Sequence, residues 1–199
     1  MGPSKAPRAE CMAFEKLDGS NVRVKWTRNK GFALFGSRYA LIDHTDPILG
    51  EVVAIFRKKY DEALNRLIRR QWPNEREVVV FGEFFGSHSF AGVHQQDDLK
   101  DYVIFDILVG HKVKRLVRPQ DFVKLMNGLH IPRLIYRGMF GQEFVQRVRS
   151  NEFGLNEGVI CKGTIDGPRG RWMCKVKTEE YFERLKSRGL DLKEYGEGE

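Results

Sequence analysis

A lysine directly before a tight turn is the residue in this sequence best suited to covalent chemistry. Lys16 follows the strand-like run Met12–Glu15 and precedes Asp18-Gly-Ser20, after which apolar and polar residues alternate from Val22 to Trp26. Glycine takes no side-chain room and lets the backbone turn sharply, so a ligand phosphate could approach the lysine closely. The same residues also suit a β-hairpin with a solvated lysine, because Asp-Gly is a common hairpin turn.

Three carboxylates stand between apolar residues inside or at the edge of strand-like runs. Glu83 lies within residues 77–86, Asp106 lies within residues 101–109, and Glu157 precedes the apolar residues 158–161. Burying a lone carboxylate costs free energy unless a cation or hydrogen-bond donors meet it. These residues therefore indicate either structural salt bridges or a site that binds cations.

Two further lysines, Lys175 and Lys177, fall on one face of the strand expected at residues 172–177, because side chains alternate with a period of two. A protonated lysine is a poor nucleophile, and neighbouring cations or a metal ion favour its neutral form. Lys175, Lys177 and a bound Mg²⁺ would do this for Lys16 while neutralising a triphosphate. Glu157 would then serve as an oxygen ligand of that hard cation.

The elements that must position these side chains are strands with helices between them and no regular βαβ repeat. Hydrophobic spacing and turn residues predict strands at residues 12–15, 22–26, 31–38, 77–86, 101–109, 131–136, 155–162 and 172–177. Helices are predicted over residues 51–72, 119–127 and 142–150, with a last one capped by Thr178. This pattern indicates one α+β domain with largely antiparallel sheets.

The charge balance favours a polyanionic partner. The net charge is +7, and basic residues gather at positions 66–76, at positions 112–118 and at Arg169 and Arg171. Such clusters neutralise phosphates in sequence-independent nucleic-acid binding, although any one of them could be an ordinary solvated surface. The composition, 41% hydrophobic and 31% charged, excludes a disordered chain, and no apolar run is long enough to span a membrane.

The cysteines and histidines suggest neither disulfides nor zinc. Cys11, Cys161 and Cys174 are odd in number and no secretory signal precedes them, so we expect reduced thiols in a cytoplasmic protein. The five histidines show no ligand spacing with these cysteines, and we therefore predict no structural zinc.

Six short motifs together resemble a known enzyme family. They are Lys16-Leu-Asp-Gly-Ser-Asn21, Ser37-Arg38, Phe81-Gly-Glu-Phe-Phe-Gly86, Phe105-Asp106, Glu157-Gly-Val-Ile-Cys-Lys162 and Lys175-Val-Lys177. In this order, over residues 15–177, they resemble the covalent nucleotidyltransferases, which include ATP-dependent DNA ligases, RNA ligases and mRNA capping enzymes. The resemblance implies an ATP-grasp-like ligase adenylylation domain in which two largely antiparallel sheets flank the nucleotide site.

The resemblance also implies a role for each charged residue of these motifs. Lys16 would attack the α-phosphate of ATP and hold AMP through a phosphoramide bond, while Lys162, Lys175 and Lys177 would contact phosphates. Asp106 and Glu157 would support the lysine and a metal ion, Mg²⁺ or Mn²⁺. Phosphoryl transfer needs positioning and charge neutralisation more than covalent chemistry from the protein, which agrees with such a set.

The remaining motif residues would bind the nucleotide. By resemblance, Glu15 reads the adenine amino group, Phe105 stacks on adenine and Glu83 binds the ribose hydroxyls. Asn21 and Arg38 would contact the nucleotide or the 5′-phosphate end of the polynucleotide.

The motif at residues 81–86 helps to separate the branches of the family. Phe-Gly-Glu followed by a hydrophobic residue is similar to the nick-sealing RNA ligases of bacteriophages and trypanosome editing complexes, and the Glu15-Lys16 pair agrees. Asp18 departs from the phage pattern and is more similar to DNA ligases. The resemblance thus implies an ATP-dependent RNA ligase that joins 5′-phosphate and 3′-hydroxyl ends.

Three other activities stay open at this point. A minimal DNA ligase would act on DNA or an RNA/DNA hybrid, and a non-catalytic nucleic-acid-binding module would retain the scaffold without the chemistry. GTP-dependent capping is disfavoured because the 22 residues after Lys177 are too few for the oligonucleotide-binding barrel of those enzymes.

The boundaries expected from the sequence divide the chain into three parts. Residues 1–10 form a flexible lead, residues 11–190 form the nucleotidyltransferase domain and residues 191–199 form a charged tail, with no oligonucleotide-binding domain. We expect a monomer in the cytoplasm, or in the host cytoplasm if a phage encodes it.

Overall fold

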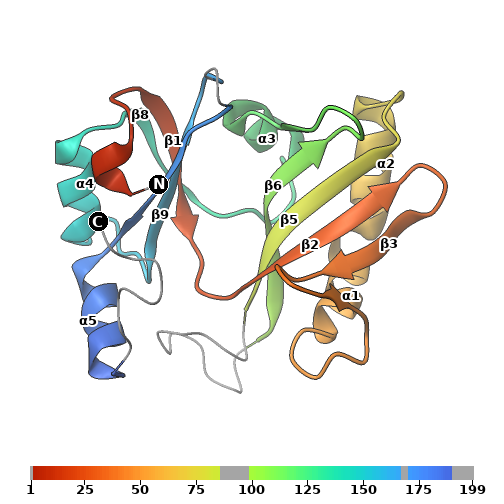
Figure 1. The fold of residues 1–199 in the computed structure, drawn as a ribbon, viewed down its shortest axis with the longest axis horizontal. Helices are drawn as coiled ribbons and strands as arrows, with labels where there is room; N and C mark the ends of the chain where they lie inside the picture. The colour runs from red at the N-terminus through yellow and green to blue at the C-terminus, as the bar shows by residue number, and fades with distance from the viewer. Residues whose placement is uncertain (1, 86–98, 167–169, 190–199) are drawn as a thin grey trace.

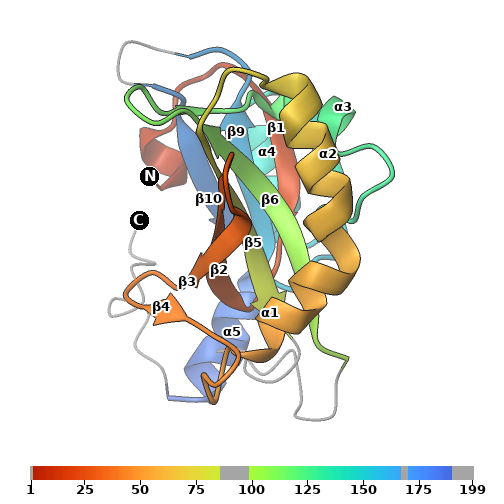
Figure 2. The same cartoon turned by 90° about the vertical axis from the view of Figure 1, so that its right-hand side faces the viewer.

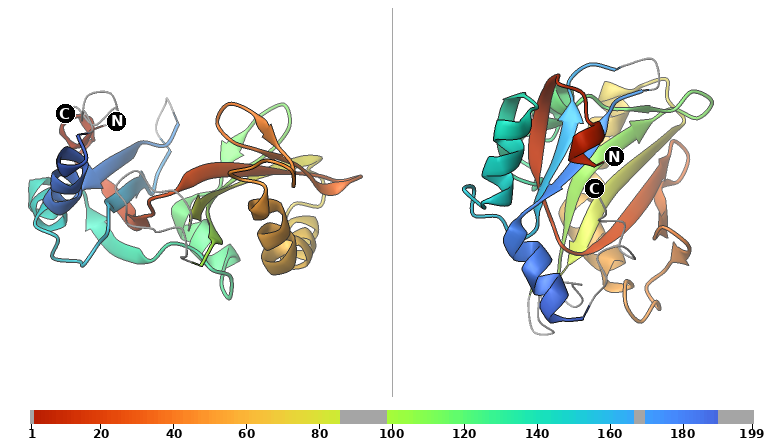
Figure 3. Two further views of the ribbon diagram at one scale, coloured as in Figure 1. Left: turned by 90° about the horizontal axis from the view of Figure 1, so that it is seen from below. Right: turned by 60° about the vertical axis from the view of Figure 1, so that its left-hand side comes forward.

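The computed structural model of the chain describes residues 2–85, 99–166 and 170–189. Two antiparallel sheets stand next to each other, and each packs against helices (Figure 1; Figure 3, left). The prediction of an α+β fold with two largely antiparallel sheets is therefore confirmed. No helix within the described ranges has the length and hydrophobicity needed to cross a membrane.

The small sheet has the strand order β10-β9-β1-β8, formed by Met173–Lys177, Gly158–Gly163, Glu10–Lys16 and Leu134–Met139. Helix α4 (Gln142–Arg149) packs on β9 and β10. Its residues Phe144, Val145 and Val148 recur at helical spacing and are buried in the core of this sheet.

Helix α5 (Glu179–Ser187) follows β10 and is capped as the sequence predicts. The hydroxyl oxygen of Thr178 accepts a hydrogen bond from the backbone N–H of Tyr181 at 3.1 Å. Gly189, with φ of 70°, comes just after the helix ends.

The large sheet has the strand order β4-β3-β2-β5-β6-β7. Its strands are Leu41–Ile42, Gly31–Gly36, Ser20–Thr27, Glu77–Phe85, Asp101–Val109 and Arg115–Leu116. Helices α1 (Glu51–Phe56) and α2 (Glu62–Gln71) form one continuous rod that lies along this sheet (Figure 2). Helix α3 (Pro119–Leu125) begins at a proline, as expected from the residues.

The rod from α1 to α2 buries one residue in every four: Val52, Phe56, Tyr60, Leu64 and Ile68. An α-helix turns once in about 3.6 residues, so a strict spacing of four would drift around its surface by about 40° per step. The π-helical turn at residues 57–61 winds more slowly and keeps the buried face on the sheet. The prediction of a single helix over residues 51–72 is thus right in extent to within one residue, while the π turn was not predicted.

The segment that contains the Asp-Gly turn passes from one sheet to the other. Strand β1 pairs with β8 and β9 in the small sheet, whereas β2 pairs with β3 and β5 in the large sheet. The hairpin alternative is therefore wrong, because β1 and β2 are not partners. Residues 17–19 instead place the end of β1, where Lys16 lies, at the junction of the two sheets (Figure 1).

Some segments differ from the sequence expectation. The strand expected over residues 131–136 runs from Leu134 to Met139 instead, since Pro132 has no N–H to donate to a sheet. The strand expected over residues 155–162 runs from Gly158 to Gly163. Within the expected flexible lead, Pro3–Lys5 forms a short 3₁₀ turn and Ala6 packs against the small-sheet core. The predicted tail, residues 191–199, lies outside the described residues.

Candidate active site

A cavity of about 360 Å³ lies between the two sheets, where strands β1, β2, β5, β6, β9 and β10 contribute side chains. Most residues that the sequence assigns to the site line it: Glu15, Lys16, Asn21, Glu83, Phe105, Asp106, Lys162 and Lys175. These residues come from five of the six motifs and from both sheets, so the fold brings the predicted site together.

Lys16 is held in place by the carboxylate of Glu157. The Nζ atom of Lys16 lies 2.6 Å from Oε1 of Glu157, and Nζ of Lys177 lies 2.8 Å from the same oxygen. Glu157 is almost fully buried, and its other oxygen, Oε2, has no hydrogen-bond partner within the described structure. One oxygen of this carboxylate thus positions two lysines, and the other oxygen can still accept a hydrogen bond.

The strand register explains why these three residues meet. Gly158 pairs with Lys16 on one side and with Lys177 on the other, so Glu157 lies at the point where the three strands converge. Gly158 has φ of 154°, and a Cβ there would lie 2.1 Å from the carbonyl oxygen of Val176. Only glycine allows the chain to pass so closely.

We predict that Gly158→Ala destabilises the fold by about 3 kcal/mol or more, because it adds both a steric clash and an unfavourable φ. Gly141→Ala is the matched control: its Cβ would enter open space and its φ of −169° is extended. Urea unfolding measures the free energy of unfolding of both variants, and the control should lose less than about 1 kcal/mol of it. Equal losses would contradict this interpretation of Gly158.

Glu83 faces the same junction from β5. It pairs across the sheet with Asn21, and burial raises its pKa to about 7, with Glu157 and Asp18 adding to the shift and Lys16 opposing it. Residues 17–19, which link β1 to β2, pass close to β5 at Gly19. A Cβ at Gly19 would lie 2.4 Å from the carbonyl oxygen of Phe84, so only glycine fits there. Near neutral pH, Glu83 can therefore both donate and accept hydrogen bonds.

The raised pKa of Glu83 predicts a pH-dependent stability. The folded state holds a proton that the unfolded state releases above its ordinary pKa near 4.5, so stability falls as pH rises from about 4.5 to 7. Glu83→Gln should remove this component, on the order of 2 kcal/mol, from the free energy of unfolding measured across that range. An unchanged pH profile in the variant would count against a protonated Glu83.

Lys162 joins the two sheets behind the cavity. Its Nζ lies 2.8 Å from Oδ1 of Asp106 and donates to the carbonyl oxygen of Phe105 at 2.6 Å. The ammonium group also lies 5.1 Å from the ring centre of Phe14 and 5.7 Å from that of Phe122. Burial lowers the pKa of Lys162, and the ion pair with Asp106 opposes that shift.

Glu15 is oriented by an arginine that sequence reasoning did not select. Arg133 donates to Oε2 of Glu15 from Nε at 2.7 Å and to Oε1 from a terminal nitrogen at 3.2 Å. The backbone N–H of Glu15 also bonds the carbonyl oxygen of Arg133. No local pattern could reveal this pair, because its members are 118 residues apart and meet only through sheet pairing.

Arg38 does not join the other predicted site residues in this structure. Ser37 accepts hydrogen bonds from the N–H groups of Tyr39 and Ala40, which folds the chain into a turn between β3 and β4. This turn leaves Arg38 exposed, with its guanidinium 5.5 Å from the ring centre of Tyr39.

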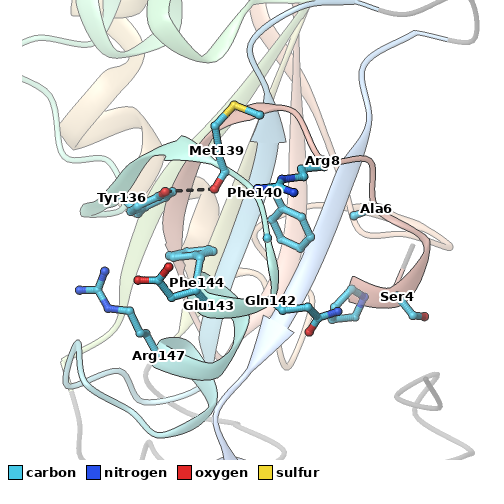
Figure 4. Close-up of a pocket in the computed structure, with 12 residues that line it drawn as sticks. Ser4, Ala6, Arg8, Tyr136, Met139, Phe140, Gln142, Glu143, Phe144 and Arg147 are labelled. Atoms are coloured by element: carbon cyan, nitrogen blue, oxygen red, sulfur yellow. Dashed lines mark hydrogen bonds between the residues drawn. The ribbon is translucent and has the colours of Figure 1, made fainter.

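A second cavity is larger than the one between the sheets. A space of about 590 Å³ lies beside α4 on the small sheet, where Tyr136 stacks on Phe144 and donates to the carbonyl oxygen of Met139 (Figure 4). Arg8 and Arg147 also line it, but none of the predicted site residues does. We therefore assign the chemistry to the smaller cavity between the sheets.

The metal prediction rests on two carboxylates, each of which contacts a lysine. The described part of the chain contains no group of three or more His, Cys, Asp or Glu side chains arranged to hold a metal ion. The unpaired Oε2 of Glu157 nevertheless provides a buried anionic acceptor beside Lys16. A carboxylate oxygen of this kind is a ligand that a divalent cation prefers.

Comparisons with known proteins agree with this class of site. A sequence model of the RNA ligase family matches residues 9–177, which is most of the chain. The chain therefore belongs to the RNA ligase family. Among curated proteins, no sequence matches it.

Solved structures share the fold at low sequence identity. An RNA ligase variant from Naegleria gruberi, determined with ATP and Mn, is 16% identical with a TM-score of 0.63, covering 92% of this chain and 54% of that one. An archaeal ATP-dependent RNA ligase is 17% identical with a TM-score of 0.63, covering 94% and 46%. A protein from Aquifex aeolicus assigned as an ATP-dependent DNA ligase is 18% identical with a TM-score of 0.61, covering 98% and 56%. The chain thus spans about half the length of these relatives.

Proposed function

We propose that the chain is the adenylylating domain of an ATP-dependent RNA ligase. The observation that carries this proposal is the position of Lys16, whose Nζ lies at the cavity between the sheets, 2.6 Å from the Glu157 carboxylate. Membership of the RNA ligase family supports it, as does the determination of a structurally similar RNA ligase with ATP and Mn.

The first chemical step is attack by Lys16 on ATP. The amine of Lys16 forms a bond to the α-phosphorus, the bond to the bridging oxygen breaks, and pyrophosphate leaves. Lys16 must lose a proton before this attack, and Oε1 of Glu157 is the acceptor within hydrogen-bond distance. The product is a phosphoramide between Lys16 and AMP.

Two transfers then complete the joining reaction. The 5′-phosphate of a polynucleotide attacks the lysyl-AMP, which frees Lys16 and gives an adenylylated end. A 3′-hydroxyl attacks the 5′-phosphorus of that end, and AMP leaves as the phosphodiester forms. Over the three steps, ATP is converted to pyrophosphate and AMP, and one phosphodiester bond is formed.

Nucleotide recognition follows from the residues around the cavity. Phe105 would stack on the adenine, Glu15 would accept from its amino group, and Glu83 would bind ribose hydroxyls through its donor and acceptor oxygens. Asn21 and the exposed Lys175 would contact phosphates at the open side of the cavity. Arg38 would serve the polynucleotide end rather than the nucleotide, because it does not line this cavity.

A divalent cation, Mg²⁺ or Mn²⁺, would neutralise phosphate charge when bound, with Glu157 as its oxygen donor and Asp106 as the second candidate carboxylate. Lys177 and Lys162 hold these two carboxylates in position by ion pairs of 2.8 Å.

The polynucleotide is proposed to carry 5′-phosphate and 3′-hydroxyl ends of RNA. Incubation with ATP, Mg²⁺ and nicked duplexes of RNA, DNA or RNA/DNA hybrid tests this, with joined strand and adenylylated 5′ end as products. Preference for RNA ends is the expected result. Preference for DNA ends would favour the minimal DNA ligase, to which the similarity with the Aquifex protein gives some support.

Three attributes complete the proposal. Residues 11–190 would form the adenylylation domain, acting as a monomer, with residues 191–199 as a charged tail. A reducing compartment such as the cytoplasm is supported by Cys11, Cys161 and Cys174, which are free and buried.

A further inference from the structure

The positive charge of this protein is concentrated at one end of the large sheet. Residues 28–30, 69–76 and 110–115 hold eight Lys or Arg and one Glu, a net charge of +7. The whole chain also has a net charge of +7, so its other basic and acidic residues balance. We call these three segments the basic end.

The three segments lie together although they are far apart in the sequence. The N–H of Arg28 bonds the carbonyl oxygen of Arg76, and a terminal nitrogen of Arg69 donates to the carbonyl oxygen of Arg28 at 3.1 Å. Arg115 bonds Oε1 of Glu75 at 3.0 Å. The three segments of the basic end therefore lie together, at the upper right of Figure 1.

Part of this surface is rigid. The guanidinium groups of Arg28 and Arg69 lie 5.9 Å and 5.5 Å from the ring centre of Trp26, which is fully buried. Arg28 also donates to the carbonyl oxygens of Trp72 and Glu75. These contacts fix the backbone that presents the neighbouring cations.

The outward-facing cations of the basic end have no acidic partner among the residues that the structure describes. Lys30, Arg70, Arg76, Lys112 and Lys114 are exposed, and no carboxylate of the described residues lies within ion-pair distance of them. Elsewhere, the exposed cations Arg57 and Lys59 and the half-buried Lys100 pair with acidic side chains. Unpaired cations gathered on one surface repel one another, so an external polyanion would stabilise them.

The surface suits a phosphate backbone better than a protein partner. Val113 is its only strongly exposed large hydrophobic residue among those described, so the surface offers few of the apolar side chains that the core of a protein interface buries. Closely spaced Lys and Arg side chains on turns match the contacts that bind nucleic acid without reading its sequence.

We propose that the basic end binds the backbone of duplex RNA at a distance from the ends being joined. This inference rests on the proposed function for the identity of the polyanion. Glu77, which directly follows the basic end, and Glu83 at the cavity are six residues apart on β5, or about 20 Å at ~3.3 Å per residue. That distance corresponds to about seven base pairs of an A-form RNA duplex at ~2.8 Å per base pair. The basic end would therefore bind the backbone of the duplex beside the nick, while the nick itself lies at the cavity.

The test is the salt dependence of RNA binding by the triple variant Arg70→Gln/Lys112→Gln/Lys114→Gln. Loss of three phosphate contacts should reduce the slope of log K against log salt by about two to three and weaken binding about tenfold or more at ~0.1 M salt. The matched control, Lys5→Gln/Lys58→Gln/Lys186→Gln, removes three exposed cations from other elements and should bind like the parent.

Duplex length provides a second readout. The parent should bind a nicked RNA duplex with about 12 base pairs on each side of the nick more tightly than one with about four, and the triple variant should bind both alike. Parent-like binding by the triple variant, or an equal loss in the control, would overturn the inference. Self-adenylylation, measured in parallel, should be unchanged in both variants. Its absence in the parent would refute the proposed function without affecting the binding result.

Discussion

Replacing Glu157 with glutamine is expected to slow the formation of lysyl-AMP by about 10²-fold to 10³-fold. The variant keeps the size of the side chain but removes the charge that holds Lys16 and Lys177 and the oxygen that can accept the proton of Lys16. The rate is measured by intact mass against time of incubation with ATP and Mg²⁺.

Two comparisons separate a chemical effect from a structural one. Glu143→Gln changes an exposed glutamate outside the site and should react at the parental rate. Raising the pH from about 7 to about 9 should partly restore Glu157→Gln, because solvent then removes the lysine proton without an acceptor in the protein. A rate within about fivefold of the parent would rule out Glu157 as the positioning carboxylate and proton acceptor.

The second large effect is on stability. Lys162→Met is expected to lower the free energy of unfolding by about 3 to 5 kcal/mol, because it leaves the buried carboxylate of Asp106 without its cation. Urea unfolding measures this loss, with the exposed Lys124→Met as a matched control that should change stability by less than about 0.5 kcal/mol.

A double variant tests whether the ion pair is the cause. Lys162→Met/Asp106→Asn removes both charges and should recover most of the lost stability, since no unpaired charge stays buried. Its adenylylation should nevertheless stay impaired, because Asp106 and Lys162 line the nucleotide cavity. If the double variant is no more stable than Lys162→Met, the loss of stability would come from lost packing of Lys162 against Phe14 and Phe122 and not from the unpaired charge.

Much of the site could be predicted because its residues belong to short motifs whose spacing is set locally. Lys16 ends a strand before a Gly turn, and Glu83 stands alone in an apolar strand, so both are visible in the sequence. Lys175 and Lys177 alternate correctly for one face of β10. The alternation of side chains along a strand and the turn after it do not depend on how the strands are arranged in the sheets.

The rest depended on tertiary pairing that the sequence does not display. Arg133 reaches Glu15 only because β8 lies beside β1, and Glu157 meets two lysines only because β9 lies between β1 and β10. The basic clusters at residues 66–76 and 112–118 are visible in the sequence, but the hydrogen bonds that join Arg28 of the β2–β3 turn to Arg69 and Arg76 are not. Arg38 was placed by resemblance alone, and the turn at Ser37 directs it away from the cavity.

The measurement that tests the proposed chemistry most directly is intact mass after incubation with ATP and Mg²⁺, for the parent and for Lys16→Ala. We predict a gain of one adenylyl group in the parent, reversed by pyrophosphate, and no gain in the variant. Prior treatment with pyrophosphate ensures that the parent starts without bound AMP. A parent that gains no mass after this treatment, or a Lys16→Ala protein that gains the same adenylyl group, would contradict Lys16 as the nucleophile.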